Sequence, residues 1–210
     1  MLFTVIEKYF GAQLSDSQRA QFDVLATLYP EWNARVNVIS RQDIGNLEVN
    51  HVLHSLAIAR FVPFKPGTEV LDLGTGGGFP GVPLAVLFPE TRFHLVDRIA
   101  KKLRVAEDII RQAGIANVTL QHGDIGEVRG RKFDFVVSRA VMDLRDMVPL
   151  VKRLISHGGE NVVPNGLICL KGGDVSGETQ QWRHSAIVDD LATYFSEPFF
   201  QTKKLIYLPL

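Results

Sequence analysis

The spacing of hydrophobic positions changes at about residue 66, which divides the chain into two parts. Before that point apolar residues recur at helical spacing, as in Phe22, Leu25, Ala26 and Tyr29. The segment Ser15-Asp16-Ser17-Gln18 is a capping-box pattern and predicts the start of this helix. Pro30 predicts its end. A short amphipathic piece over 32–36 and a helix over about 47–61 are expected to follow.

Beyond Pro66-Gly67, short apolar runs alternate with segments of helical period. Strands are expected over 69–73, 92–96, 118–121, 133–138 and 167–171. Helices are expected over 81–88, 99–113 and 144–155. A last helix over 182–195 and an antiparallel edge strand over 203–207 would complete the chain.

This alternation indicates right-handed crossovers and a mainly parallel sheet that is covered on both faces. The sequence therefore predicts a doubly wound, Rossmann-like α/β fold. An N-terminal helical region (1–66) is expected to pack on a core over 67–210, so that the two parts make one structural domain.

Composition narrows the class of protein. With 210 residues, 46% of them hydrophobic and 22% charged, the chain can bury a core without disulfides or a structural metal. The single cysteine, Cys169, lies in an apolar run, which excludes a disulfide framework and a cysteine zinc site. His51 and His54 have no third ligand at a suitable spacing, so no metal is expected.

Two further features favour a cytoplasmic protein without a membrane partner. No apolar stretch reaches the roughly 18 residues that a membrane span needs. The first ten residues include Glu7 and Lys8 and do not resemble a signal peptide.

Charge is balanced, with 23 basic and 23 acidic residues, which excludes a generally basic coat for nucleic acid. Two local basic clusters remain. One contains Arg98, Lys101, Lys102, Arg104 and Arg111, and the other contains Arg129, Arg131 and Lys132. The first cluster is either a solvated helix face or a phosphate-binding patch.

The segment 70–81 carries most of the chemical information. Four glycines fall within residues 74–78, between a predicted strand and a predicted helix, where doubly wound sheets bind their ligands. Gly76-x-Gly78-x-x-Gly81 formally matches the dinucleotide fingerprint. We expect Gly74, Gly76 and Gly78 to approach a cofactor.

Two carboxylates help to choose that cofactor. Asp72 precedes the glycines, where it would repel a pyrophosphate by several kcal/mol in order of magnitude. It would attract the ammonium and sulfonium groups of S-adenosylmethionine, directly or through water; the alternative is a hydrogen bond within the loop or at the helix start. Asp97 ends the second strand, 19 residues after Gly78, and is placed to accept from ribose hydroxyls. Its alternative role is to cap the helix that opens near Ile99.

Several motifs together resemble one family over nearly the whole chain. They are Asp72-Leu-Gly-Thr-Gly-Gly-Gly-Phe-Pro-Gly81, Asp97-Arg-x-x-Lys-Lys102, Val137-Ser-Arg-Ala140, Leu170-Lys-Gly172, Trp32-Asn-x-x-x-Asn37 and His51-x-x-x-Ser-Leu56. The chain resembles the RsmG family, also called glucose-inhibited division protein B. The resemblance implies a class I S-adenosylmethionine-dependent methyltransferase that modifies guanine N7 in the decoding-region loop of 16S ribosomal RNA. Its partner would be 16S RNA or an assembling small-subunit particle, and we expect a monomer.

The resemblance also implies roles for single residues. Gly74 and Phe79 would contact the cofactor, Ile125 and Gly126 would flank its adenine, and Arg139 would lie near the methyl-transfer mouth. The chain departs from the family pattern at 124–126, where Asp-Ile-Gly replaces the usual Arg-Ala-Glu, so Asp124 or Glu127 would have to replace the glutamate's contact.

Another departure is His54, which replaces a common aspartate. A structural role for that position would tolerate this change better than a catalytic one. Trp32 could stack on a flipped base, but an aromatic residue in an amphipathic helix favours a core position.

Guanine N7 bears no proton, so its methylation needs no general base and depends on positioning and desolvation. We expect Arg139 and Lys171, at the ends of the fourth and fifth predicted strands, to hold RNA phosphate or the guanine O6 edge. For either cation the alternative is a salt bridge to a neighbouring carboxylate.

Other functions remain open from the sequence. A methyltransferase with a small-molecule substrate would keep the cofactor site. An NAD-dependent oxidoreductase would use the glycine fingerprint. A non-enzymatic RNA-binding protein would retain only the fold.

Overall fold

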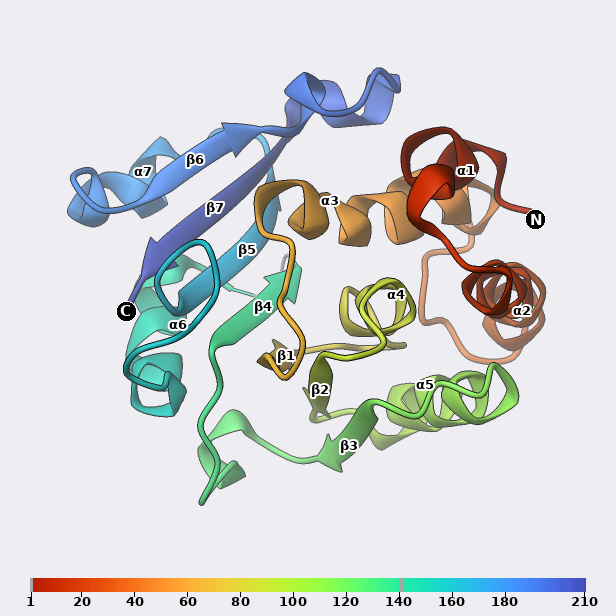
Figure 1. Ribbon diagram of the computed structural model, residues 1–210, viewed down its shortest axis with the longest axis horizontal. Coiled ribbons are helices and arrows are strands. Elements are labelled where there is room, and N and C mark those ends of the chain that lie inside the picture. The colour runs from red at the N-terminus through yellow and green to blue at the C-terminus, as the bar shows by residue number, and fades with distance from the viewer. Residues whose placement is uncertain (1, 140–141) are drawn as a thin grey trace.

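A computed structural model describes residues 2–139 and 142–210. Ala140, which closes the Val-Ser-Arg-Ala motif, lies outside the described residues. A seven-stranded sheet in the order β3-β2-β1-β4-β5-β7-β6 forms the centre of the molecule (Figure 1). Its strands are β1 (Glu69–Leu73), β2 (Arg92–Asp97), β3 (Val118–His122), β4 (Phe135–Arg139), β5 (Gly166–Gly172), β6 (Ile187–Asp190) and β7 (Lys203–Pro209). Strands β1 to β5 are parallel, and β7 runs antiparallel to both β5 and β6.

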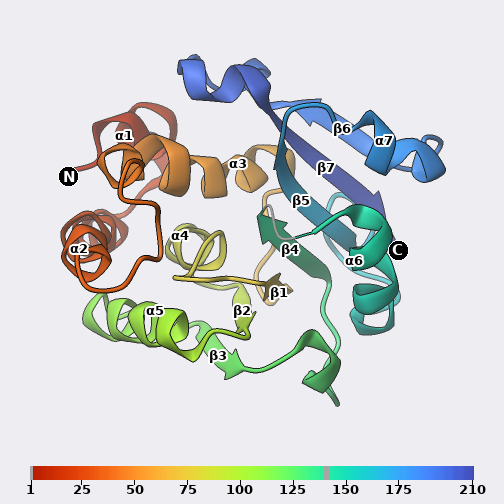
Figure 2. The same cartoon turned by 180° about the vertical axis from the view of Figure 1, so that it is seen from behind.

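Helices cover both faces of this sheet. They are α1 (Thr4–Phe10), α2 (Asp16–Asn33), α3 (His54–Phe61), α4 (Gly81–Leu87), α5 (Ala100–Gln112), α6 (Leu144–Val151) and α7 (Ser176–Thr179). A π-helix (Leu47–Leu53) leads directly into α3. Short 3₁₀ turns occupy Gly11–Gln13, Ile44–Asn46, Ile125–Glu127, Lys152–Leu154, Gln180–Trp182, Leu191–Thr193 and Pro198–Thr202. Figures 1 and 2 show α1 to α5 on one side of the sheet and α6 with α7 on the other.

The two covered faces explain why the strands are apolar at nearly every position. Along β1, Val70 packs into the core beneath the N-terminal helices, whereas Leu71 packs into the core beneath α6. Parallel strands buried on both faces read as continuous apolar runs, which is the pattern that the sequence shows. The strands predicted over 69–73, 92–96 and 167–171 therefore differ from β1, β2 and β5 by at most one residue at each end.

The N-terminal region packs directly on the sheet. Helix α2 contacts α4 and α5, and α3 contacts α4 and β5. The capping box that begins α2 is formed as predicted, because the Gln18 amide donates to Ser15 Oγ (3.2 Å) and the Ser15 amide donates to Gln18 Oε1 (2.8 Å). Buried side chains of α2 and α3 share one hydrophobic core with the sheet.

Several predictions of secondary structure were wrong. Helix α2 does not end at Pro30 but continues to Asn33, although a proline inside a helix removes one i→i−4 hydrogen bond. Trp32 therefore extends α2, and its indole N–H donates to Asp108 of α5 (2.8 Å), which agrees with a packing role.

The segment 182–195 does not form the helix that was expected. It contains β6, whose β-branched Ile187 and Val188 pair with β7, and β6 rather than β7 is the edge strand. Within the described residues, no helix combines the length and the apolar character that a bilayer crossing requires.

Candidate active site

The glycine-rich turn joins the carboxyl end of β1 to α4. The amides of Gly74 and Thr75 both donate to the Val96 carbonyl (2.9 and 3.2 Å), which ties the turn to β2. Gly78 has φ +106°, and a Cβ there would lie 2.6 Å from Val82 Cγ2. A Cβ on Gly77 would lie 2.7 Å from Val38 Cβ. Gly77 and Gly78 are thus required by the close approach of Val38 in the N-terminal region and of Val82 in α4.

Asp72 lies beneath this turn and has no exposed surface. Its Oδ2 accepts from the Thr75 hydroxyl (2.6 Å) and from the Gly81 amide (2.8 Å). Burial raises the pKa of Asp72 to about 7, although both hydrogen bonds act in the opposite direction. This geometry agrees with the alternative role, a hydrogen bond that holds the loop and the start of α4. Asp72 has no exposed surface for direct contact with a cofactor, and its Oδ1 has no hydrogen-bond partner among the described residues.

Asp97 lies at the open end of the crevice. Its Oδ2 accepts from the Gly76 amide (2.7 Å) and its Oδ1 accepts from the Ile99 amide (2.7 Å). The carboxylate therefore braces the turn and caps the start of α5 at the same time. It also borders a cavity of about 370 Å³, a size typical of small-molecule sites. The cavity is lined by Leu73, Gly74, Val96, Asp97, Arg98, Ile99, Gly123, Ile125 and Met142.

The segment after β3 forms the far wall of this cavity. Ile125 is buried and lines it. Asp124 accepts from the Gly126 amide (2.7 Å) and pairs with Arg98, while Glu127 accepts from the Asp124 amide (2.8 Å). Both carboxylates are therefore engaged in a capping box over 124–127. The geometry does not support the expectation that either one replaces the missing glutamate of the family.

Arg139 ends β4 next to the glycine turn. Its guanidinium carbon lies 4.8 Å from the centroid of the Phe79 ring, which is a cation–π arrangement. Its Nη1 lies 3.4 Å from the Asn50 carbonyl oxygen and 3.5 Å from that of His51. Burial lowers the pKa of Arg139 to about 10, partly offset by the nearby Asp72, so the side chain stays charged at neutral pH. No carboxylate of the described residues forms an ion pair with it.

Lys171 does not project freely into the crevice as was expected. Its Nζ lies 2.9 Å from Glu178 Oε2 and donates to the Met142 carbonyl (2.5 Å), with 11% of the side chain exposed. The salt-bridge alternative is therefore the one that the structure shows. Lys171 is engaged before any RNA arrives, so its expected role in holding the substrate is not supported.

The comparisons with known proteins agree with this architecture. The family described as "GidB: rRNA small subunit methyltransferase G" matches residues 18–206. The chain belongs to this family. Ribosomal RNA small subunit methyltransferase G of Bacteroides thetaiotaomicron is 54% identical over 203 residues, which cover 97% of this chain and 98% of the relative. The protein of the same name from Porphyromonas gingivalis is 53% identical over 207 residues, covering 98% and 93%.

Solved structures confirm the class I methyltransferase fold of this family member. A proposed O-methyltransferase from Nostoc punctiforme has a TM-score of 0.58 at 18% identity, covering 75% of this chain and 56% of that one. A SAM-dependent methyltransferase from Aquifex aeolicus has a TM-score of 0.52 at 14% identity, covering 69% and 82%. At these identities the likeness establishes the fold alone.

Sequence reasoning missed several residues that shape the site of this rRNA methyltransferase G family member. Asp43 lies 2.6 Å from His51 Nε2, Val38 and Tyr29 pack on the glycine turn, and Met142 lines the cavity. The Trp32-Asn-x-x-x-Asn37 and His51-x-x-x-Ser-Leu56 motifs pointed to the N-terminal region but not to these residues. Nothing in the sequence pattern indicated Asp43, because it lies between the predicted elements, before the helix expected over about 47–61.

The two histidines differ in their surroundings. His54 is buried against Phe199 and Phe200, and burial lowers its pKa well below the ordinary value. This placement agrees with a structural role for His54. Across residues 2–139 and 142–210, no group of three or more His, Cys, Asp or Glu side chains is arranged to hold a metal ion.

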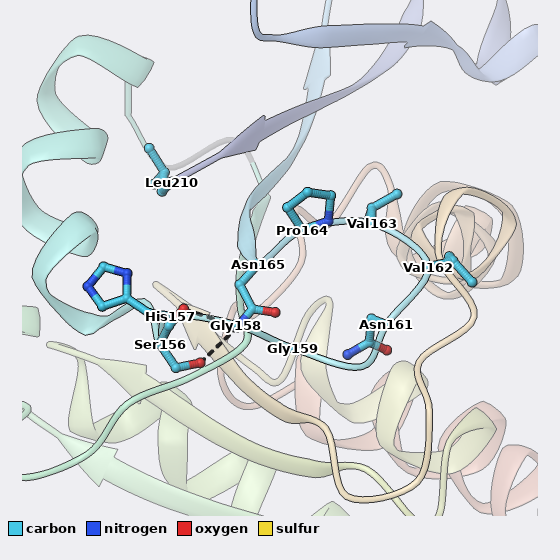
Figure 3. Close-up of a pocket in the computed structure, with 10 residues that line it drawn as sticks. All are labelled: Ser156, His157, Gly158, Gly159, Asn161, Val162, Val163, Pro164, Asn165 and Leu210. Carbon is cyan, nitrogen blue, oxygen red and sulfur yellow. Dashed lines mark hydrogen bonds between the residues drawn. The ribbon is translucent and has the colours of Figure 1, made fainter.

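A second cavity, of about 410 Å³, lies away from the crevice. It is lined by the loop that precedes β5 and by Leu210 (Figure 3). The Asn165 amide within it donates to the hydroxyl and the carbonyl of Ser156 (2.9 and 3.1 Å). This loop is at the amino end of β5, opposite to the edge at which the glycine turn, Asp97 and Arg139 meet.

Proposed function

We propose that this protein transfers the methyl group of S-adenosylmethionine to guanine N7 in the decoding-region loop of 16S ribosomal RNA. The substrate is 16S RNA or an assembling small-subunit particle, and the protein acts as a cytoplasmic monomer. The observation that carries the proposal is the position of Arg139 at the carboxyl end of β4. Its side chain is charged, lies over the Phe79 ring and forms no ion pair with a carboxylate of the described residues, and the neighbouring strand β1 ends at Leu73, which lines the cavity together with Gly74.

The residues around the cavity fit S-adenosylmethionine. Ile125 and Met142 offer apolar surface for the adenine, and Asp97 lies where a ribose would pass the end of β2. When bound, the cofactor supplies a methyl group activated by a sulfonium. Gly74, Gly76 and Gly78 leave the backbone open to close approach, whereas Ile125 and Gly126 form the wall on the adenine side.

The start of α4 argues against a dinucleotide. A pyrophosphate in a Rossmann fold binds the free amides at a helix N-terminus. In this protein the Gly81 amide already donates to Asp72, and every residue of α4 is buried. The oxidoreductase alternative therefore has no anion site at the glycine turn.

The proposed chemistry relies on positioning. Guanine N7 presents a lone pair and no proton, so no residue has to act as a base. Arg139 would hold the guanine O6 edge or an adjacent phosphate, and Phe79 would exclude water from the reacting atoms. Pre-organised contacts of this kind lower the barrier because the reactants are already aligned.

RNA would extend from this mouth over α5. Lys101, Lys102 and Arg104 have no ion-pair partner among the described residues, whereas Arg98 and Arg111 pair with aspartates. The Lys102 side chain lies along the turn, since its Cδ would be 3.8 Å from a Cβ on Gly76. The basic patch of unpaired side chains therefore contains three residues of the sequence cluster, Lys101, Lys102 and Arg104. It adjoins the glycine turn.

The experiment is methyl transfer from labelled S-adenosylmethionine to small-subunit particles, naked 16S RNA and a metabolite extract. We expect 7-methylguanosine at one position of 16S RNA, mapped by nuclease digestion and mass spectrometry. Label only in a metabolite would favour a small-molecule substrate. Heat of binding with NAD but none with S-adenosylmethionine in calorimetry would favour an oxidoreductase, and RNA binding without methyl transfer would favour a non-enzymatic protein.

A further inference from the structure

The carboxylate of Asp43, in the N-terminal region, accepts hydrogen bonds from the side chains of two consecutive residues, Asn50 and His51. Asp43 Oδ2 lies 2.6 Å from His51 Nε2, and Asp43 Oδ1 accepts from the Asn50 amide group (2.6 Å) and from that of Asn46 (3.2 Å). Burial acts to raise the pKa of Asp43, but these hydrogen bonds outweigh it and hold the pKa below its ordinary value. Asp43 is therefore a charged acceptor that fixes the side chains of Asn50 and His51.

The main-chain carbonyls of the same two residues face Arg139. They belong to the π-helix, and their oxygens lie 3.4 and 3.5 Å from Arg139 Nη1. The remaining described contact of the guanidinium is the ring of Phe79. Single π-helical turns are frequent at functional sites, where they re-aim backbone groups. The N-terminal region thus supplies the polar part of the Arg139 site.

His51 completes the arrangement. Its ring centroid lies 5.7 Å from that of Phe79, on which Arg139 is also stacked. Burial, with a further contribution from the charge of Arg139, lowers the pKa of His51 to about 4. The ring is neutral at physiological pH, so its Nε2–H donates to Asp43 and no second cation faces Arg139. Its Nδ1 is buried without a partner among the described residues.

We propose that Asp43 and His51 form a positioning pair, which fixes the π-helix so that its carbonyls hold the Arg139 guanidinium over Phe79 at the methyl-transfer mouth. The inference rests on the proposed role of Arg139. The N-terminal region then completes the catalytic mouth, rather than only covering the sheet. Neither residue of the pair touches the substrate; both act through Arg139.

The chemistry of the pair suggests informative substitutions. Asp43→Asn replaces one of the two acceptor oxygens with an NH2 donor, so either the hydrogen bond from His51 or those from Asn46 and Asn50 are lost. His51→Ala removes the donor to Asp43. His51→Gln keeps an N–H donor near the position of Nε2 but has no counterpart of Nδ1. Glu31→Gln, at an exposed carboxylate of α2, is the matched control.

The experiment combines kinetics with a direct view of Arg139. Each variant is assayed for methyl transfer to small-subunit particles, and the Arg139 Nε–Hε signal is followed by ¹H–¹⁵N NMR. We expect D43N and H51A to lose activity by tenfold to a hundredfold in order of magnitude, in the same kinetic parameter that R139A changes, and to shift or broaden this signal. H51Q and E31Q should resemble the unchanged protein in both measurements.

Three results would overturn the proposal. H51Q as inactive as H51A would mean that Nδ1 contacts the base directly. Lost activity with an unchanged Arg139 signal would mean that the pair does not act through Arg139. Full activity in D43N would mean that the Asp43 carboxylate is not needed to position Arg139.

Two complications have their own controls. If D43N does not fold, Asn50→Ala removes one of the two short hydrogen bonds of Asp43 from a partly exposed side chain and serves the same test. If the unchanged protein methylates no RNA, the proposed function fails, whereas the NMR comparison still decides whether the pair positions Arg139.

Discussion

Lys171 of β5 and Glu178 of α7 form a largely buried ion pair, with 2.9 Å between Nζ and Oε2 and with 11% and 14% of their side chains exposed. Each partner makes a second contact at the segment that leads into α6 or at its first residue. Lys171 donates to the Met142 carbonyl (2.5 Å), and Glu178 accepts from the Leu144 amide (3.0 Å). Because Met142 lines the cavity bordered by Gly74 and Asp97, the pair connects the fold of α6 and α7 to the shape of that cavity.

The first prediction concerns the stability of this pair. Lys171→Ala should lower the free energy of unfolding by about 3–5 kcal/mol, since it leaves Glu178 buried without its counter-charge. The double variant K171M/E178L should lose less than K171A, because it buries no unpaired charge. Urea unfolding of the three proteins measures the difference, with the exposed Lys65→Ala as control. If K171A kept its stability but lost methyl transfer, Lys171 would act on the substrate, as the sequence suggested, and not in the stability of the fold.

Arg139 is the subject of the second prediction. Arg139→Ala should lower methyl transfer about a hundredfold or more with the fold intact, since the group that orients the base is gone. Arg139→Lys should retain little of the activity, because an ammonium group lacks the planar guanidinium that stacks on Phe79 and donates to two acceptors. Single-turnover assays on small-subunit particles measure the loss, and Arg145→Ala, at an exposed arginine, is the control. Unchanged turnover of R139A would reject the assignment.

The raised pKa of Asp72 leads to a prediction about pH. The pKa rises from an ordinary 3.8 to about 7 through burial, so between these values the folded protein binds more protons than the unfolded chain. Stability from this group is therefore present at low pH and is lost as the pH rises through about 7. The amide side chain of the Asp72→Asn variant would not titrate and would keep an oxygen for Thr75 and Gly81. D72N should gain stability relative to the unchanged protein between pH 5 and 8, measured by urea unfolding at each pH.

The same variant tests whether the charge of Asp72 selects the methyl donor. If Asp72 only holds the turn, calorimetry should give D72N an affinity for S-adenosylmethionine close to that of the unchanged protein. A large fall in affinity at pH 8, where the carboxyl is ionised, would restore the electrostatic role that the sequence suggested. A stability difference that stays flat with pH would contradict the buried, titrating carboxyl.

The sequence predicts most of the sheet and much of the crevice for a common reason. Strands such as β1 and β2 are buried on both faces, so their apolar runs are unambiguous, and the carboxyl ends of parallel strands must meet. Gly74, Asp97 and Arg139 lie at the carboxyl ends of three such strands and therefore at the same edge of the sheet. What these side chains contact could not be predicted to the same extent, as the loop role of Asp72 shows.

The remaining errors arise where local pattern does not decide the structure. Segment 187–190 becomes a strand because β7 lies beside it, a contact that no helical or strand period reveals. The Lys171–Glu178 pair and the Asp43–His51 pair each join residues of different segments, so they depend on how the chain between these segments folds. In each case tertiary contacts outweigh the local preference.

The last prediction concerns the basic patch of Lys101, Lys102 and Arg104. If these side chains contact RNA phosphates, they release counterions on binding, and affinity falls steeply with salt. Replacing all three with alanine should reduce the slope of log K against log salt concentration by about 0.7 for each phosphate of single-stranded RNA that the variant no longer binds. Binding to small-subunit RNA at four salt concentrations measures the slope. Methyl transfer at saturating RNA should change little, because none of the three lines the cavity bordered by Gly74 and Asp97.

The matched control is the pair Arg98 and Arg111, which belong to the same sequence cluster but are bound to Asp124 and Asp108. Replacing Arg111 with alanine removes a positive charge whose carboxylate partner already neutralises it, so the salt slope should change less than for any one of the unpaired residues. Equal changes for R111A and K101A would mean that net charge, rather than phosphate contact, sets the affinity. A triple variant with an unaltered slope would place the RNA on another face of the protein.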